Sequence, residues 1–432
     1  MNNLESKSNR FIIVIILLLI QTFCWINTNT SIGGKMLALS LTGVSILLLI
    51  RSYLKGNSIL FIVFLFMMTY PLILNAYYFF DIYFSFFNQC YEPDLVYFAA
   101  QLLLLFYTVL YFSIKIGSPK LNTSLQHRPN LIGYLVTMGF IIAIVFSRVT
   151  GDSILSSGSY SGVTSTRSFV PIEYALMFIP LAYIYSKNRF QLYALYLFTL
   201  LFCLKYLLYG GRVALLEVFI VFFILKFQYE WGLKKSLIYT SILGILMLIY
   251  GVIRKDFSSA VFTAEELDLN SANAGEVYYS SVRILYFLKY NILSLTDRAW
   301  SFILYIFSGF FYGLSLPPLS NLSVYLKDQY PSGGGGLAPI YFYTYLSYPG
   351  VLFLGYFIGK IFSKITEFKR IMTKDVYTIM VVTMVPRWFA YYPVHLVKLC
   401  MYASIAFLLL NLLDRYMSLT YKRPTNNLSD VQ

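Results

Sequence analysis

Apolar stretches of about 15–22 residues recur from one end of this 432-residue chain to the other, and an α-helix of that length crosses about 30 Å of hydrocarbon. Hydrophobic residues make up 58% of the chain and charged residues only 12%, well below the roughly 25% of charged residues in a soluble domain. The residue alternation of a transmembrane β-barrel is absent. The sequence therefore predicts an all-α polytopic integral membrane protein, with residues 1–432 forming a single membrane domain.

The apolar stretches predict twelve transmembrane helices and a large loop before the tenth. The first stretch follows Lys7 and Arg10, but no small-x-small cleavage site comes after it, which predicts an uncleaved first span. The predicted spans are 11–26, 36–50, 59–80, 95–114, 131–147, 169–186, 191–209, 213–227, 237–253, 340–361, 376–391 and 394–413.

The basic residues predict how these spans are oriented, because cytoplasmic loops are enriched in Lys and Arg. With the N-terminus in the cytoplasm, the cytoplasmic segments carry the whole net charge of +14, and the charges of the outer segments cancel. Both termini are then cytoplasmic, and 254–339 is a large outer loop. Its parts 284–295 and 299–313 are apolar enough to lie in the interface or to re-enter the membrane. The basic charge thus reflects topology and indicates no nucleic-acid partner.

Arginines on the predicted outer side are the strongest functional signal. Arg212 lies in a tight hairpin between two spans, in "KYLLYGGRVALLEVF". Arg254 follows the ninth span, Arg283 lies in the large loop, and Arg387 lies in "MVPRWFAYYP" within the eleventh span. An arginine at mid-bilayer costs at least about 2.5–3.5 kcal/mol, and its planar guanidinium binds phosphate bidentately. These residues are therefore candidate phosphate ligands.

Structural roles compete with phosphate binding at each arginine. An arginine can extend its guanidinium to lipid headgroups or pair with a nearby acid, and for Arg298, beside Asp297, this interpretation is favoured. Glu217 follows Arg212 by five residues, an imperfect helical pairing. Glu217 is either an internal partner of Arg212 or a polar strut to another span.

Outer carboxylates are candidate general bases, since transfer to a hydroxyl group commonly needs one. Glu276 precedes Arg283 by seven residues, so on a helix the two share a face, two turns apart. Glu173, Asp256 and Asp297 compete with Glu276 for this role.

The sequence predicts neither a metal nor a cofactor. His395 opens the last span near Arg387, where a structural role is favoured over a catalytic one. Walker, dinucleotide-binding and zinc motifs are missing. Four cysteines show neither a disulfide framework nor metal-ligand spacing: Cys24, Cys90, Cys203 and Cys400.

A glycine run leads into the tenth span in "DQYPSGGGGLAPIYFYTYLSYPGVLFLGYFIGK", residues 328–360. The four glycines allow close backbone approach or a hinge, and Gly350, Gly355 and Gly359 allow tight helix packing. The surrounding tyrosines either stack on sugars or form the interfacial aromatic belt, and the belt is favoured: Tyr341, Tyr343, Tyr345 and Tyr348.

Together these features resemble the Wzy-type O-antigen and oligosaccharide repeat-unit polymerases of bacteria. The resemblance covers the layout of the whole chain and is specific in 209–217, 331–360 and 384–393, which hold the GGR hairpin, the glycine-rich stretch and the late outer arginine. It implies a metal-independent glycosyltransferase without cofactors at the outer face of the inner membrane. Donor and acceptor would be glycans on undecaprenyl pyrophosphate, and a chain-length regulator protein is a further implied partner.

The resemblance also implies roles for the candidate residues. The arginines hold the pyrophosphate and stabilise its developing charge, Glu276 is the general base, and Glu217 and His395 support the site. The pyrophosphate ligands are Arg212, Arg254, Arg283 and Arg387.

Three other functions stay open. The related O-antigen ligase shares the layout, but resemblance to it calls for a histidine in the large outer loop, and 254–339 contains none. A repeat-unit flippase or another transporter also has about twelve spans and is expected to show mid-span charges and repeat symmetry. A non-catalytic scaffold leaves the outer arginines unexplained.

Overall fold

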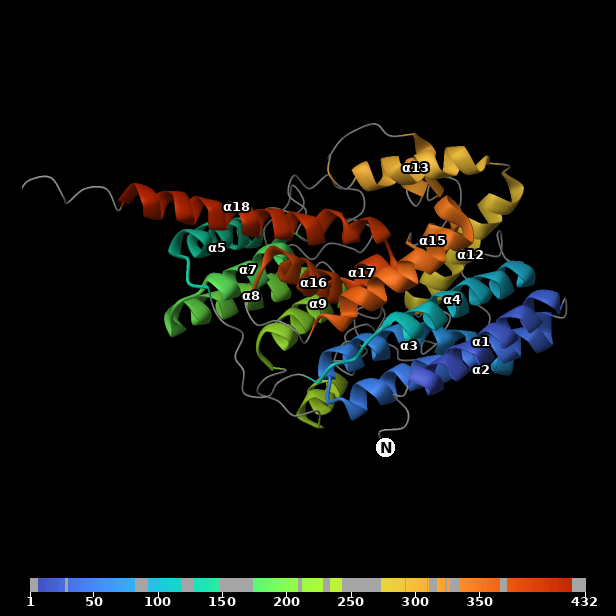
Figure 1. The fold of residues 1–432 in the computed structure, drawn as a ribbon. Helices are drawn as coiled ribbons and strands as arrows, with labels where there is room; N and C mark the ends of the chain where they lie inside the picture. Colours follow the sequence, from blue (N-terminus) through green and yellow to red (C-terminus); the bar gives the residue numbers. More distant parts are fainter. Residues whose placement is uncertain are drawn as a thin grey trace, which may run out of the picture. The chain divides into compact units, whose positions relative to one another are not determined.

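The computed structural model of the protein is helical in all the regular elements that it describes. Figure 1 shows these helices in chain order from blue to red. The described residues are 7–27, 30–81, 92–118, 128–147, 174–208, 212–227, 234–242, 273–291, 293–308, 310, 317–322, 325–326, 335–365 and 371–421.

Within these ranges, seven helices are long and apolar enough to cross a membrane. Each coincides with a predicted span to within a few residues, so the chain is an α-helical multi-pass membrane protein. Six of the seven lie in α1 (Lys7–Ile26), α2 (Thr30–Leu54), α3 (Ser58–Phe80), α4 (Pro93–Ser113), α8 (Arg189–Leu208) and α15 (Ala338–Ser363); the seventh, Pro393–Ser418, combines η8 (Pro393–Leu396) with most of α18 (Lys398–Tyr421).

The other five predicted spans are shorter, interrupted or only partly described. The span at 376–391 is divided into α16 (Thr373–Thr383) and α17 (Val385–Ala390), because Pro386 lacks the N–H that would continue the first helix. Twelve spans and a large outer loop therefore stay predictions. The other four of these five spans correspond to α5 (Leu131–Phe146), α7 (Ala175–Tyr185), α9 (Arg212–Phe222) with its π-helical end η4 (Phe223–Phe227), and the helix at 234–242.

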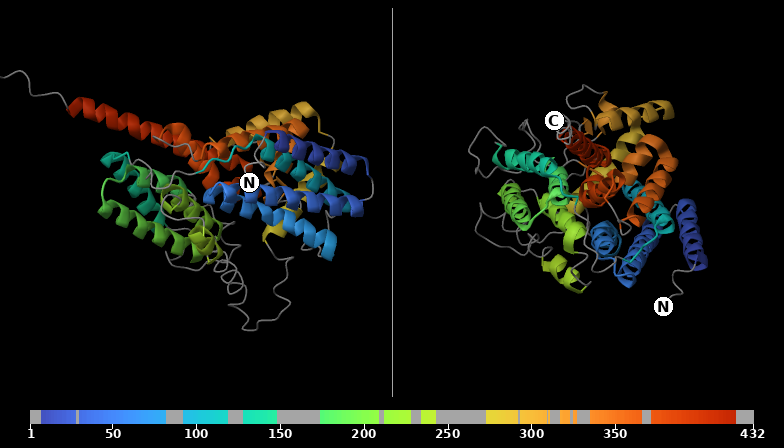
Figure 2. Two further views of the ribbon diagram at one scale, coloured as in Figure 1. Left: turned by 60° about the horizontal axis from the view of Figure 1, so that its bottom comes forward. Right: turned by 60° about the vertical axis from the view of Figure 1, so that its left-hand side comes forward.

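The chain divides into two compact units, and the first comprises 1–122, 228–367 and 384–398. Figures 1 and 2 show its helices α1 to α4 side by side, and α15 packs against α4. Gly355 and Gly359 permit this packing, since added Cβ atoms would lie 3.0 Å from the Phe106 oxygen and 1.9 Å from Ser113 Oγ. The predicted glycine-mediated helix packing is confirmed here.

Helix α12 (Asn273–Tyr290) is buried within the first unit, against α3, α4 and α15. This segment lies in the predicted large outer loop, yet its Tyr278, Ser281 and Arg283 are fully buried. Hydrogen bonds explain how the core accommodates them: Tyr278 Oη donates to the Val96 oxygen at 3.0 Å, and Ser281 Oγ accepts from the Leu337 N–H at 2.8 Å. Satisfied polar groups can be buried at little cost.

Helix α13 (Leu295–Ser308) follows α12 and has two different faces. Its apolar residues Trp300 and Phe307 are exposed, whereas Ser301 and Tyr305 are buried. A short helix with an exposed apolar face fits the predicted interfacial position, although the side of the membrane on which it lies stays a prediction.

The second unit comprises 123–227, 368–383 and 399–432. Helices α5, α7 and α8 lie side by side in it (Figure 2). Lys205 of α8 is buried, and its Nζ donates to the carbonyl oxygens of Ile144 at 3.1 Å, Val145 at 2.7 Å and Ser147. These carbonyls end α5 and lack partners within the helix. A cation inside a predicted span is thus explained as the cap of a neighbouring helix.

Candidate functional site

The end of the glycine run forms a tight junction of three segments in the first unit. Gly335 and Gly336 have φ of 89° and 148°, values that favour glycine. A Cβ on Gly335 would lie 3.2 Å from Tyr391 Cα, and a Cβ on Gly336 would lie 2.9 Å from Ile284 Cδ1. The Gly336 N–H also donates to the Ala390 oxygen at 3.3 Å. We call this contact between α12, the start of α15 and the end of α17 the glycine junction.

Stacked tyrosines lie directly beside the glycine junction. Tyr341 Oη donates to the Gly335 oxygen at 3.1 Å, and the ring of Tyr305 stacks on Tyr341 and Tyr345 with centroids 6.2 and 5.4 Å apart. All three side chains are buried. The expected interfacial belt is therefore wrong for Tyr341 and Tyr345, because α13 covers the face of α15 that carries them.

Tyr343 and Tyr348 are half-buried, and their rings lie edge to face with a centroid distance of 5.2 Å. Phe98 contacts Tyr343 at 5.1 Å, and Trp25 contacts Tyr348 at 5.5 Å. These two tyrosines therefore join α15 to α1 and α4, and neither belongs to the stack at the glycine junction.

Arg387 and His395 lie on the segment that closes the junction. Arg387 is half-buried in α17, its Nε is enclosed, and its carbonyl oxygen accepts from the N–H groups of Tyr391 and Tyr392 at 2.9 Å each. His395 is buried in η8. The neighbouring Val394 N–H donates to Tyr305 Oη at 2.9 Å, so hydrogen bonds fix this turn to the tyrosine stack.

Glu276 and Arg283 lie on one helix, α12, as their spacing predicted. Glu276 is half-buried in the first turn. Arg283 is fully buried, and its Nη1 donates to the Leu326 oxygen at 3.4 Å. Two other residues of α12, Ser281 and Ile284, contact the glycine junction. The first unit thus brings together the segments that carry four predicted site residues.

The other predicted site residues lie elsewhere. Arg212 opens α9 in the second unit, and its side chain, like all of Arg254, lies outside the described residues. Glu217 of α9 is fully buried in the second unit. Its role as a partner of Arg212 or as a strut between spans stays a prediction.

Arg298 stabilises a broken helix and does not pair with Asp297, which accepts from Ser294 Oγ at 2.5 Å. The Arg298 guanidinium donates to the carbonyl oxygens of Tyr343, at 2.6 Å, and Thr344. Just beyond, α15 breaks at Ser347, where φ is 57° and ψ −155°. A regular helix would use the Thr344 oxygen for the Tyr348 N–H. The arginine therefore supplies donors beside the break.

We expect Arg298→Met to lower the melting temperature of the purified protein. The free energy of unfolding should fall by about 1–3 kcal/mol, because the carbonyl groups of Tyr343 and Thr344 lose their donors. Arg298→Lys should lose less, because lysine keeps the charge and one donor group. Asp297→Asn is the control and should change nothing, since asparagine still accepts from Ser294. If Asp297→Asn destabilised the protein as much as Arg298→Met, an ion pair between the two residues would explain the result instead.

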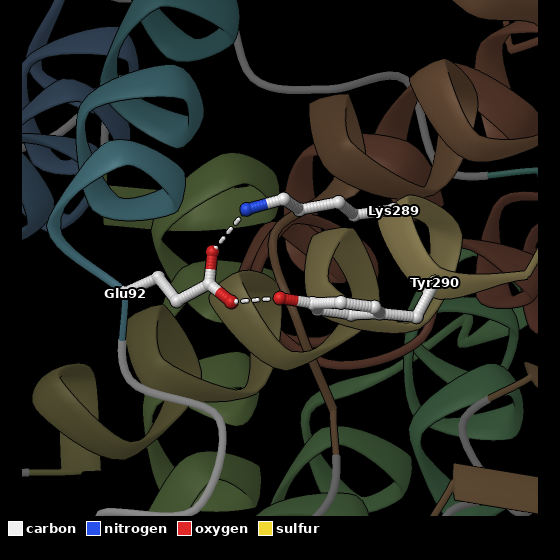
Figure 3. Close-up of polar contacts among 3 residues, drawn as sticks. All are labelled: Glu92, Lys289 and Tyr290. Atoms are coloured by element: carbon white, nitrogen blue, oxygen red, sulfur yellow. Dashed lines mark hydrogen bonds and ion pairs between the residues drawn. The ribbon is translucent and has the colours of Figure 1, made fainter.

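One polar cluster was not anticipated from the sequence: Glu92, Lys289 and Tyr290 (Figure 3). Glu92 directly precedes α4 and accepts from Lys289 Nζ at 2.5 Å and Tyr290 Oη at 2.7 Å. These donors lower the pKa of Glu92, and its carboxylate raises the pKa of Lys289. The contact therefore weakens only as pH falls through the lowered glutamate pKa or rises through the raised lysine pKa. It joins the end of α12 to α4 across neutral pH.

Comparison with protein-family models, with curated proteins and with solved structures gives no match to this chain. The functional interpretation therefore rests on its residues and their arrangement.

Proposed function

We propose that this protein polymerises lipid-linked oligosaccharide repeat units at the periplasmic face of the bacterial inner membrane. The observation that carries the proposal is the glycine junction. There α12, with Glu276 and Arg283, and α17, with Arg387, are joined through the glycine run. A half-buried arginine and a half-buried carboxylate on joined helices provide an anion ligand and a general base.

The proposed reaction transfers the growing glycan to the incoming repeat unit. A hydroxyl oxygen of the incoming unit attacks the anomeric carbon of the growing chain, and Glu276 takes the hydroxyl proton. The bond between that carbon and the pyrophosphate oxygen breaks, and undecaprenyl pyrophosphate leaves with the bonding electrons. Arginine side chains stabilise the charge that develops on the leaving group.

The described arginines differ in how directly they can act. Arg387 is half-buried, so we assign it to the pyrophosphate. Arg283 is enclosed and donates to the Leu326 oxygen, so its contact with substrate requires α12 or the segment at Leu326 to move. We also assign Arg212 to the pyrophosphate, on the basis of its hairpin sequence alone.

A flippase is the second candidate, and two observations favour it. Helix α15 is broken at Ser347, and discontinuous helices form the substrate sites of many transporters. Glu217 is a fully buried carboxylate within α9, and buried intramembrane charges often mark transport pathways. The polymerase is preferred because it also explains an arginine and a carboxylate on the two helices, α17 and α12, that the glycine run joins.

Deletion of the gene separates these functions when surface polysaccharide is analysed on a gel. Loss of the polymer ladder with a single repeat unit still attached to the lipid core is the result expected for a polymerase. Loss of every repeat unit from the core would instead indicate a flippase or a ligase. An unchanged ladder would contradict all three functions.

A further inference from the structure

The break in α15 brings together two tyrosines that a regular helix would keep apart. Tyr343 lies before the break at Ser347 and Tyr348 lies directly after it. Residues five apart in a regular helix lie on different faces, yet these two rings are in contact. A Cβ on Gly350 would lie 2.4 Å from the Phe342 oxygen, although eight residues of helix rise about 12 Å. The second half of α15 therefore begins beside the end of the first half.

The backbone at this break is strained. Ser347 has φ of 57° and ψ of −155°, a combination that is essentially restricted to glycine. Such strain persists only where the surrounding structure holds it, and it is concentrated at catalytic and ligand-binding sites. An interfacial aromatic belt needs no break in a helix, so a belt alone leaves the strain unexplained.

Trp25 and Phe98 extend the tyrosine pair into a group of four rings. Trp25 at the end of α1 contacts Tyr348, and Phe98 near the start of α4 contacts Tyr343. Trp25 is 48% exposed, and the other three rings are half-buried. We call Trp25, Phe98, Tyr343 and Tyr348 the aromatic patch. It lies toward the end of α15 that the glycine junction precedes, since Tyr343 follows Gly336 by seven residues.

A polar donor lies against the aromatic patch. The guanidinium carbon of Arg298 is 5.8 Å from the centre of the Tyr343 ring. Arg298 Nε and Nη2 donate to the carbonyl oxygens of Thr344 and Tyr343. The remaining nitrogen, Nη1, carries two N–H groups; it is not enclosed, and it has no acceptor among the described residues. The patch therefore combines partly exposed aromatic rings with an accessible donor.

This combination fits a sugar. The faces of a sugar ring carry C–H groups that pack on aromatic rings, and its hydroxyl oxygens accept hydrogen bonds. Sites for small ligands commonly combine aromatic side chains with a few convergent polar groups. We propose that the aromatic patch and Arg298 form a subsite for the glycan part of the lipid-linked substrate. The inference rests on the proposed polymerase function and specifies where sugars beyond the reacting bond are held.

The test measures binding of a soluble glycan by the purified full-length protein in detergent, using isothermal titration calorimetry. The probe is the repeat-unit oligosaccharide of the protein's own source, released by mild acid from lipid and pyrophosphate. The wild type should bind it. Trp25→Leu should bind it about fivefold more weakly, which corresponds to about 1 kcal/mol, the contribution of one aromatic contact. Trp25→Tyr keeps a ring and should retain most of the affinity.

Trp300→Leu is the matched control, because Trp300 is a 61% exposed tryptophan on α13, outside the aromatic patch. It should bind the oligosaccharide like the wild type. An equal loss in Trp300→Leu would overturn the proposal, since any exposed tryptophan would then have the same effect. Absence of binding by the wild type would also overturn it.

The Trp25 variants must remain folded for this comparison. Because Trp25 is half exposed, the melting temperature of Trp25→Leu should equal that of the wild type. Tyr348→Leu removes a second ring of the patch from a different helix and should weaken binding in the same way. Undiminished binding by folded Trp25→Leu and Tyr348→Leu would leave the interfacial belt as the role of these rings.

Two further measurements separate the subsite from the chemistry. Glu276→Gln should bind the oligosaccharide like the wild type, although it should not polymerise. Trp25→Leu should raise the repeat-unit concentration needed for half-maximal elongation about fivefold, with the maximal rate unchanged, because the patch is remote from the bond that breaks. Elongation without any oligosaccharide binding would refute the subsite alone. Binding that depends on Trp25 in a protein that elongates nothing would refute the polymerase and keep the subsite.

Discussion

Arg387→Lys is expected to slow repeat-unit polymerisation about 30-fold, and Arg387→Ala up to about 1000-fold, corresponding to on the order of 2–4 kcal/mol of lost transition-state stabilisation. Lysine keeps the charge but loses the planar fork that holds two phosphate oxygens. The measurement is the rate of chain growth in membranes with equal amounts of each variant.

Arg189→Lys is the control for this change, because Arg189 is an exposed arginine at the start of α8. It should polymerise like the wild type. The same two substitutions at Arg212 test the hairpin arginine independently. If well-expressed Arg387→Lys produced a normal ladder, Arg387 would only anchor the chain to lipid headgroups, which lysine does equally well.

Gly335→Ala is expected to destabilise the protein by about 2–5 kcal/mol and to reduce polymerisation in the protein that remains folded. An alanine at positive φ costs roughly 1–2 kcal/mol, and overpacking adds about 1–3 kcal/mol. The new Cβ would meet backbone, 3.2 Å from Tyr391 Cα and 3.3 Å from the Ala390 oxygen. The measurement is the melting temperature in detergent together with the rate of chain growth.

Two other glycines separate the causes of this effect. A Cβ on Gly56, where φ is 63°, or on Gly43 within α2 would meet no atom within 4 Å. Gly56→Ala should therefore show only the backbone cost, and Gly43→Ala should be neutral or stabilising, since alanine favours helix. A loss no larger at Gly335 than at Gly56 would show that packing at the glycine junction contributes nothing.

The long apolar helices could be predicted because lipid offers no hydrogen-bond partners, so a long apolar stretch must form its backbone hydrogen bonds within itself, as an α-helix does. Helix α12 could not be predicted in the same way. Its buried Tyr278 and Ser281 are accommodated by hydrogen bonds to Val96 and Leu337, and composition does not reveal such distant partners. The same limit explains Lys205, whose acceptors at the end of α5 lie about 60 residues earlier in the chain.

In the candidate site, too, local features could be predicted from the sequence, whereas contacts between distant segments could not. The shared helix of Glu276 and Arg283 followed from local spacing, and the close approach at the glycine run followed from the absence of side chains. The contact of Gly335 with Tyr391 could not be predicted from the sequence, because it depends on how the start of α15 packs against the end of α17. Sequence neighbourhood alone suggests the wrong partner for Arg298. Asp297 is adjacent in sequence, but the guanidinium donates to the carbonyl oxygens at the break in α15.

The most direct test of the central claim is elongation by the purified protein of undecaprenyl-pyrophosphate-linked repeat units in excess chelator. Because the chemistry is proposed to use arginines and a carboxylate without metal, products should lengthen by whole repeat units. One undecaprenyl pyrophosphate should be released for each bond formed, and Glu276→Gln should abolish both signals. Failure of folded wild-type protein to extend the repeat units of its own source, with or without added divalent cations, would contradict the account.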